Sequence, residues 1–176
     1  MPVLPAVLAL LLVLVPQAPP THPAPADRDR VRPMDAPAAT LVAEGARRAP
    51  TIAALLDRLA HSALVVYISL DGRVAVRGTL TFVAHGGGVT YVLVRIQPVF
   101  LIADRLAALA HELQHAVEVA DAGDTITDAN ALAAYYRRIG TEYRKGLFES
   151  VQARVVEAQV RREITAPPAA ARNKQR

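Results

Sequence analysis

The sequence contains no cysteine and no tryptophan, and its aromatic residues are limited to five tyrosines and three phenylalanines. Without cysteine the chain can have no disulfide framework, no thiol nucleophile, no cysteine-ligated zinc and no lipidated cysteine. Any metal site in this protein must therefore be built from histidine, aspartate or glutamate side chains.

The excess of one sign of charge is also small. The sequence has 20 Lys and Arg residues and 16 Asp and Glu residues, which gives a formal net charge of +4. The basic excess is scattered apart from the ending ARNKQR, and no basic stretch is interleaved with aromatic residues. We therefore expect no nucleic-acid binding. The sequence also has no phosphate-binding glycine loop and no G-x-S-x-G element. It therefore does not support nucleotide binding or a serine hydrolase.

An apolar run, VLPAVLALLLVLV, occupies residues 3–15 near the N-terminus. It is too short to span a bilayer comfortably and is typical of a secretory signal, with the sequence APA at 24–26 as the cleavage site. We predict a signal over residues 1–26 and an exported protein, either secreted or periplasmic. Because no Lys or Arg precedes the run, the alternative is an uncleaved anchor that keeps the protein near a membrane.

Composition divides the remaining chain into three parts. Residues 27–39 are rich in Pro and Ala and predict an extended linker. Residues 40–166 carry the periodic apolar patterns of one folded domain. Residues 167–176 predict a flexible basic tail.

Within the domain, helical and strand-like patterns follow one another in an α+β order. The turn sequences DG at 71–72 and HGGG at 85–88 favour joining the strands into a three-stranded antiparallel meander ahead of the later helices. The predicted elements are a helix at 51–63, strands at 63–70, 73–84 and 89–96, and helices at about 100–121, 128–140 and 141–164.

The stretch LAHELQHAV, residues 109–117, places two histidines and a glutamate on the first of those later helices. Each helical residue turns by about 100°, so His115 lies one turn after His111 on the same face, and both imidazoles can reach one ion. Glu112 lies beside that face, where its carboxylate can take a proton from a metal-activated water. The H-E-x-x-H pattern therefore predicts a metal site with an adjacent base.

This stretch resembles the active-site helix of the zincin metallopeptidases, and the strands before it and helices after it resemble their layout. The resemblance implies a small zincin-like domain in which His111 and His115 ligate Zn²⁺ and Glu112 is the general base. The implied function is an exported zinc metallopeptidase that hydrolyses peptide bonds of a peptide or protein substrate with zinc-activated water. The alternative interpretation is a non-catalytic exported domain of this fold, with structural zinc or none.

Zincins need a third protein ligand, and four carboxylates compete for that place. Asp121 has the metzincin spacing, but Glu118 replaces the turning glycine of that family, and on a continuous helix Asp121 would point away. Glu118 suits a hydrogen bond to an imidazole better than ligation, and Glu142 is expected to complement a helix dipole. Glu149 heads an apolar stripe of the predicted 141–164 helix, so burial would require a partner. We predict Glu149 as the third ligand, in a site more gluzincin-like than metzincin-like.

Overall fold

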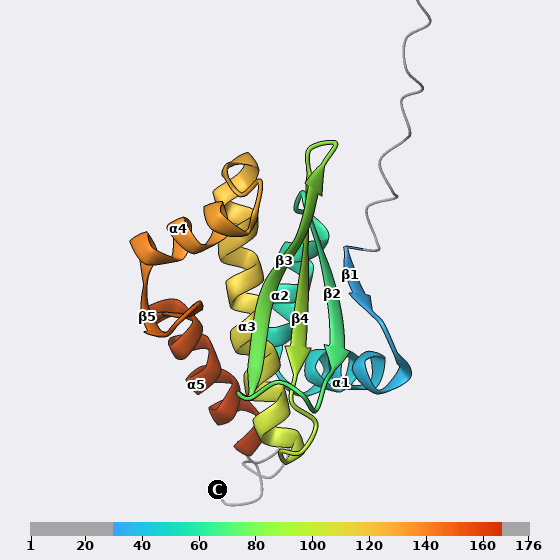
Figure 1. The fold of residues 1–176 in the computed structure, drawn as a ribbon. Coiled ribbons are helices and arrows are strands. Elements are labelled where there is room, and N and C mark those ends of the chain that lie inside the picture. The colour runs from blue at the N-terminus through green and yellow to red at the C-terminus, as the bar shows by residue number, and fades with distance from the viewer. Residues whose placement is uncertain (1–29, 167–176) are drawn as a thin grey trace, which may run out of the picture.

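Residues 30–166 are those described by the computed structural model of this chain, and they form a mixed α/β fold with five α-helices and a small sheet (Figure 1). The predicted signal and the predicted basic tail lie outside these residues. No described helix is both long and apolar enough to cross a membrane. The elements are β1 (Val31–Pro33), α1 (Ala36–Arg48), α2 (Pro50–Ala60), β2 (Leu64–Leu70), β3 (Gly78–Gly86), β4 (Val89–Ile96), α3 (Ile102–Ala122), a 3₁₀ turn (Gly123–Thr125), α4 (Ala129–Ile139), β5 (Gly140–Arg144), β6 (Leu147–Ser150) and α5 (Val151–Thr165).

The larger sheet has the strand order β1-β2-β4-β3. β2 pairs in parallel with both β1 and β4, whereas β3 pairs with β4 in an antiparallel hairpin. The three-stranded antiparallel meander predicted from the sequence is not formed, because β4 lies between β2 and β3. β3 is therefore an edge strand among the described residues, and α3 and α4 contact it.

The connection from β2 to β3 passes the end of β4. Asp71 Oδ1 accepts a hydrogen bond from Arg73 N at 2.9 Å, as the DG sequence favours. However, Gln97 Nε2 donates to the carbonyl oxygens of Gly72 and Val74, at 3.2 and 2.8 Å. These bonds hold the connection against the end of β4, so the chain passes that end before it enters β3. The local sequence predicted the turn, but it did not predict that β4 and not β3 would pair with β2.

Residues 31–39, which composition assigned to a linker, instead form β1 and the start of α1. Asp35 caps α1, since Ala38 N donates to its Oδ1 at 2.7 Å. Pro37 lies in the first turn, where its missing N–H removes no helical hydrogen bond. Ala38 and Leu41 are buried in the core. The alanine and proline content here therefore belongs to a capped helix that covers the sheet.

The predicted helix over 141–164 is also shorter in the structure, because its first part is the β5–β6 hairpin. Gly146 has φ +74°, a left-handed conformation that glycine adopts without a steric penalty, and it closes the turn. Gly146 N donates to Glu142 Oε1 at 2.7 Å, which stabilises the same turn. α5 begins only after this hairpin, at Val151.

Helix α3 is the central element of the fold. It contacts the sheet, α1 and α2, and on its other side it packs along α5 (Figure 1). Its apolar residues fill the core, and Glu112, Gln114, His115 and Glu118 on the same helix are buried with them. Burying polar groups without partners costs about 1–3 kcal/mol each, so their hydrogen bonds must be found inside the protein. The apolar core residues of α3 include Leu106, Leu109, Leu113, Ala116 and Val117.

The central position of α3 predicts a large stability loss for Leu109→Ala, because Leu109 is fully buried. The variant is expected to lower the free energy of unfolding by roughly 2–5 kcal/mol through lost burial and a cavity, measured by denaturant titration. Leu101→Ala makes the same chemical change at a residue that is 77% exposed, and it should change that free energy by less than about 0.5 kcal/mol. Equal losses in the two variants would contradict this packing.

Candidate metal centre

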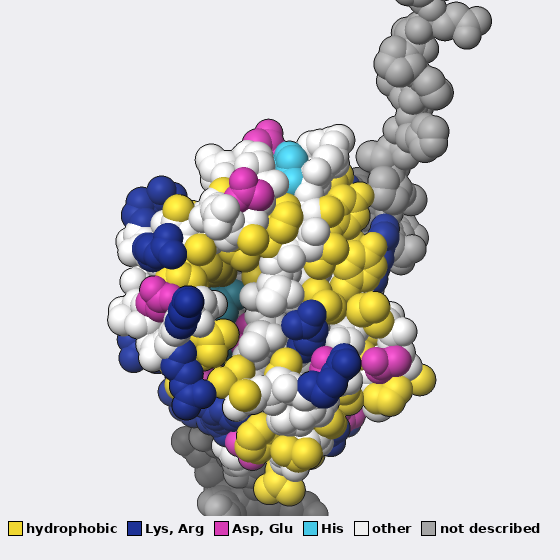
Figure 2. Space-filling model, in the orientation of Figure 1, with side chains coloured by type: hydrophobic (Ala, Val, Ile, Leu, Met, Phe, Trp, Pro, Cys, Tyr) yellow, Lys and Arg dark blue, Asp and Glu magenta, His cyan; other side chains and the backbone are white. Residues whose placement is uncertain are grey.

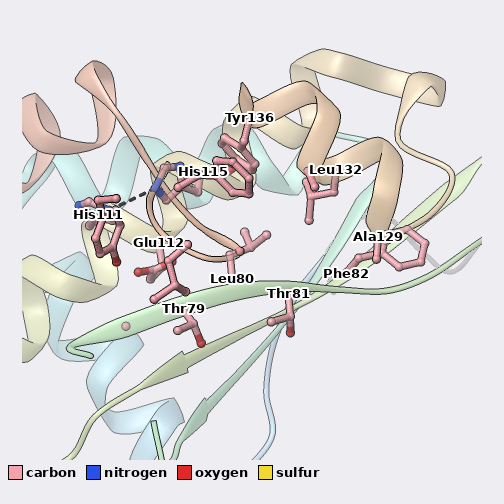
Figure 3. Close-up of a pocket in the computed structure, with 16 residues that line it drawn as sticks. Thr79, Leu80, Thr81, Phe82, His111, Glu112, His115, Ala129, Leu132 and Tyr136 are labelled. Atoms are coloured by element: carbon pink, nitrogen blue, oxygen red, sulfur yellow. Dashed lines mark hydrogen bonds between the residues drawn. The ribbon is translucent and has the colours of Figure 1, made fainter. Parts of the chain in front are cut away.

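His111 and His115 project from neighbouring turns of α3, and their Nε2 atoms lie 3.2 Å apart (Figure 3). The Nδ1 atom of His115 is 2.8 Å from Glu118 Oε2, and the Nδ1 atom of His111 is 3.2 Å from Glu157 Oε2, on α5. An ionised carboxylate only accepts hydrogen bonds, so Nδ1 is the donor in both rings. The two Nε2 atoms therefore face each other, and a proton on one ring makes their contact a hydrogen bond. When both rings are neutral, the same two atoms present their lone pairs to one region, as two ligands of one metal ion do.

The charge on these partner carboxylates follows from their surroundings. The hydrogen bond from His111, aided by Arg161, lowers the pKa of Glu157 to about 2, although burial opposes this shift. Burial raises the pKa of Glu118, but hydrogen bonds from His115 and Ser150 outweigh it and the pKa is lowered. Burial also disfavours the charged form of His111, yet Glu157 and the other nearby carboxylates raise its pKa on balance. The centre as a whole therefore attracts positive charge.

Glu149 completes a group of three ligand atoms. It lies on β6, and its Oε1 atom is 3.4 Å from His111 Nε2. The ligand atoms of Glu149, His111 and His115 all lie within 4.8 Å of one another. Glu149 Oε1 is buried and accepts no hydrogen bond within the described part of the chain. A buried carboxylate oxygen that accepts no hydrogen bond, beside two convergent imidazole nitrogens, is an arrangement that a cation satisfies, whether this is a metal ion or protonated His111.

The donor set and the two distances at His111 fit a zinc ion. Protein ligands about 2.0–2.2 Å from a tetrahedral zinc ion stand roughly 3.3–3.5 Å from one another. The distances of 3.2 and 3.4 Å at His111 Nε2 are close to this range, whereas the three ligand atoms together span up to 4.8 Å, so Glu149 would have to move toward His115 to bind the same ion. Two neutral imidazoles and one carboxylate also match zinc chemically, and the carboxylate partners of both Nδ1 atoms would fix the ligating tautomers.

Glu112 lies beside this group with only 5% of its surface exposed. Burial raises the pKa of Glu112; His115 and His111 lower it, Glu149 and Glu157 raise it, and the balance stays raised. Gly78 at the start of β3 makes room for the carboxyl, because a Cβ atom there would be 2.8 Å from both Cγ and Oε1 of Glu112. A carboxyl with a raised pKa next to a candidate metal position can accept and return a proton.

Two cavities meet at this centre, and both are lined by Gly78, His111, Glu112 and Tyr143. One, of about 300 Å³, runs between β3 and α4. The other, of about 380 Å³, includes Arg77, Glu149 and Glu157 and is more polar. Figure 2 shows a hollow with a histidine on its floor, bordered by hydrophobic side chains and by cationic ones. The cleft therefore gives a ligand access to the centre from two sides.

The other three carboxylates considered as third ligands form hydrogen bonds away from the two Nε2 atoms. Both carboxylate oxygens of Asp121 accept hydrogen bonds from Arg58 at 2.7 Å, so the metzincin spacing does not bring this residue to the centre. Glu118 contacts Nδ1 of His115 rather than the Nε2 side, and Glu142 stabilises the β5–β6 turn instead of a helix terminus. Glu149 does approach the histidines, but from a strand and not from the predicted helix.

The sequence did not predict that Glu157, Ser150 and Tyr136 would lie at this centre. Glu157 reaches His111 only because α5 packs along α3. Ser150 has two roles: its hydroxyl donates to Glu118 Oε1 at 2.6 Å and accepts from Ala153 N as the N-cap of α5. The hydroxyl of Tyr136 donates to the backbone oxygen of His115, which ties α4 to the same turn of α3. The capping role of Ser150 could have been found from its place before an apolar helical stripe.

No protein-family model matches this chain, and no curated protein or solved structure matches it either.

The double role of Ser150 predicts that Ser150→Ala lowers the free energy of unfolding by roughly 1–3 kcal/mol, because a helix cap is lost and buried Glu118 Oε1 loses its hydrogen bond. Ser69→Ala on β2 is the matched control and should have a much smaller effect. Thermal and urea unfolding of the two variants measure the difference. A Ser150→Ala protein as stable as Ser69→Ala would show that this hydroxyl does not stabilise the junction.

Proposed function

We propose that this protein is an exported zinc-dependent metallopeptidase of the zincin type, with His111, His115 and Glu149 as metal ligands and Glu112 as the general base. The observation that carries the proposal is that two imidazole Nε2 atoms and Glu149 Oε1, which accepts no hydrogen bond within the described residues, converge within 4.8 Å of one another. Export is proposed from the apolar N-terminal sequence at residues 3–15.

In this proposal, the chain positions the reacting groups and moves the proton. A bound zinc ion would supply Lewis-acid activation of water and of the scissile carbonyl. The carboxylate of Glu112 takes the proton of the attacking water and delivers it to the nitrogen of the leaving amine. Its burial and raised pKa suit both transfers. Glu118 and Glu157 hold the two imidazoles in the tautomer that presents Nε2.

The position of β3 supports a peptide substrate. Residues 78–82 of this strand line the cleft beside Glu112, and among the described residues β3 has a strand neighbour on one side only. The free edge of a strand offers backbone N–H and C=O groups to an extended peptide. A peptide aligned in this way would pass its carbonyl groups along the metal ligands.

The assignment of Glu149 predicts that Glu149→Gln weakens zinc binding by at least roughly tenfold, because an anionic ligand becomes neutral. The measurement is competition with a chromogenic chelator at neutral pH. Glu142→Gln makes the same change in the same hairpin and should leave the affinity close to that of the unmodified protein, since the amide oxygen can still accept from Gly146 N. Equal affinities in both variants would exclude Glu149 as a ligand.

The role of Glu112 predicts that Glu112→Gln slows hydrolysis by roughly 10²–10⁴-fold while zinc binding is retained. A mixture of unfolded protein substrates, with products identified by mass spectrometry, measures the rate across many peptide sequences at once. A chelator should abolish hydrolysis in the unmodified protein and added zinc should restore it. Hydrolysis unaffected by Glu112→Gln would contradict the mechanism, and zinc binding without any hydrolysis would favour the non-catalytic interpretation.

A further inference from the structure

The connection between β4 and α3 exposes a run of apolar side chains. Val99 and Leu101 are each 77% exposed, and Phe100 and Ile102 are 38% and 37% exposed. A single exposed apolar residue is common on protein surfaces, but four exposed ones in succession indicate a contact with something outside the chain. We call residues 99–102 the apolar tip.

The apolar tip lies at one end of the molecule, beyond the carboxyl ends of β2 and β4 and before the first turn of α3 (Figure 1). In Figure 2, which has the same orientation, hydrophobic side chains gather at this lower end. The β2–β3 connection lies beside the tip, because Gln97 N donates to the carbonyl oxygen of Arg77 at 2.9 Å. Arg77 and Phe100 also line the more polar cavity of the cleft together. The tip therefore adjoins the candidate metal centre.

Arginines surround the apolar tip. The two segments that form this end of the molecule, residues 71–77 and 95–105, contain four arginines and two aspartates, so their formal charge is positive. Arg161 and Glu157 of α5 contact these segments and add one charge of each sign. Arg73, in the β2–β3 connection, is almost fully exposed. Arginines clustered at a surface attract anionic lipid headgroups, and apolar side chains with such a border are typical of segments that lie in a membrane interface.

A bilayer fits the apolar tip better than a second protein does. A stable protein interface involves about 20–30 residues on each side, whereas the tip has four apolar residues next to charged segments. A bilayer needs no matching surface, and its interfacial region accepts short apolar segments with arginines at the level of the headgroups. The apolar run at residues 3–15 would add a second attachment where it is retained as an anchor, and two attachments to one surface strengthen each other.

We propose that the apolar tip inserts into the interfacial region of an anionic lipid bilayer, with the surrounding arginines against the lipid headgroups. Docking in this way holds the more polar cavity of the cleft next to the membrane surface. The proposal goes beyond the proposed peptidase function, since membrane docking needs neither zinc nor hydrolysis.

The absence of tryptophan from the sequence allows a direct test. In the full chain, Leu101→Trp places one fluorescent residue at the tip, and Val155→Trp places one at an exposed position of α5. With vesicles of mixed phosphatidylcholine and phosphatidylglycerol, the Leu101→Trp emission should shift to shorter wavelength and be quenched by brominated acyl chains. Val155→Trp should show neither effect, even where the N-terminal run tethers the chain to the vesicle. Val99→Trp repeats the test if Leu101→Trp does not fold.

The charge around the tip is tested in the Leu101→Trp chain. Arg73→Gln should raise the lipid concentration that gives half of the fluorescence shift by roughly fivefold, because one arginine near the headgroups is lost. Arg58→Gln is the matched control, since Arg58 is also an exposed arginine paired with an aspartate, but its partner Asp121 is near the other end of α3. It should leave that lipid concentration nearly unchanged.

The apolar contact is tested by Val99→Asp in the same chain, which should raise that lipid concentration at least roughly tenfold, because a carboxylate is costly to bring into the bilayer. Val155→Asp should not raise it. No shift with vesicles, equal shifts at the two tryptophan positions, or no loss with Val99→Asp would overturn the inference.

A second copy of the chain covering the tip would give a different result. The Leu101→Trp emission would then be shifted without vesicles and would depend on protein concentration, which would also overturn the inference. None of these readouts depends on zinc or turnover. Their failure therefore leaves the proposed function standing, and a protein that docks without hydrolysing peptides would keep this inference and remove the proposed function.

Discussion

Two hydrogen bonds between imidazole Nδ1 atoms and carboxylates determine where the Nε2 atoms of His111 and His115 point. Glu118, on α3 itself, orients His115, and Glu157, from the neighbouring helix α5, orients His111. With both Nδ1 atoms donating, the two Nε2 lone pairs converge on one region, and Glu149 Oε1 is added to it from β6. The proposed metal binding depends on this convergence. The proposed roles of Glu112 as a base and of the cleft as a substrate site depend on it in turn.

The same bonds connect the site to the stability of the fold. Glu112, His115 and Glu118 are buried on the helix that fills the core, where unpartnered polar groups would be destabilising. Ser150 links Glu118 to the first turn of α5, so the start of that helix and the orientation of His115 depend on one hydroxyl group. Gly78 contributes in a different way, because its lack of a side chain lets the edge strand approach the carboxyl of Glu112.

Sequence patterns predicted local structure better than pairing. Helical periodicity identified α2, α3 and α4, and three of the strands were found, but their order was not, because alternation along a strand does not say which strand lies beside it. The segment before residue 40 was misassigned because its alanine and proline content resembles a linker, although Asp35 caps a helix there and Pro37 lies in its first turn. The 141–164 segment was misassigned because its apolar spacing continued across the hairpin turn at Gly146.

By itself, the sequence determined that any metal centre must lack cysteine and that His111 and His115 share one face of a helix, since helical phase is a local property. It also selected Glu149 over Asp121, from the expected burial of the first and the helical angle of the second. Only the tertiary structure brought Glu149 to the histidines from a strand, placed Glu157 behind His111 and enclosed an apolar cavity between β3 and α4. These contacts join residues tens of positions apart, so they depend on how helices and strands pack and not on any local pattern.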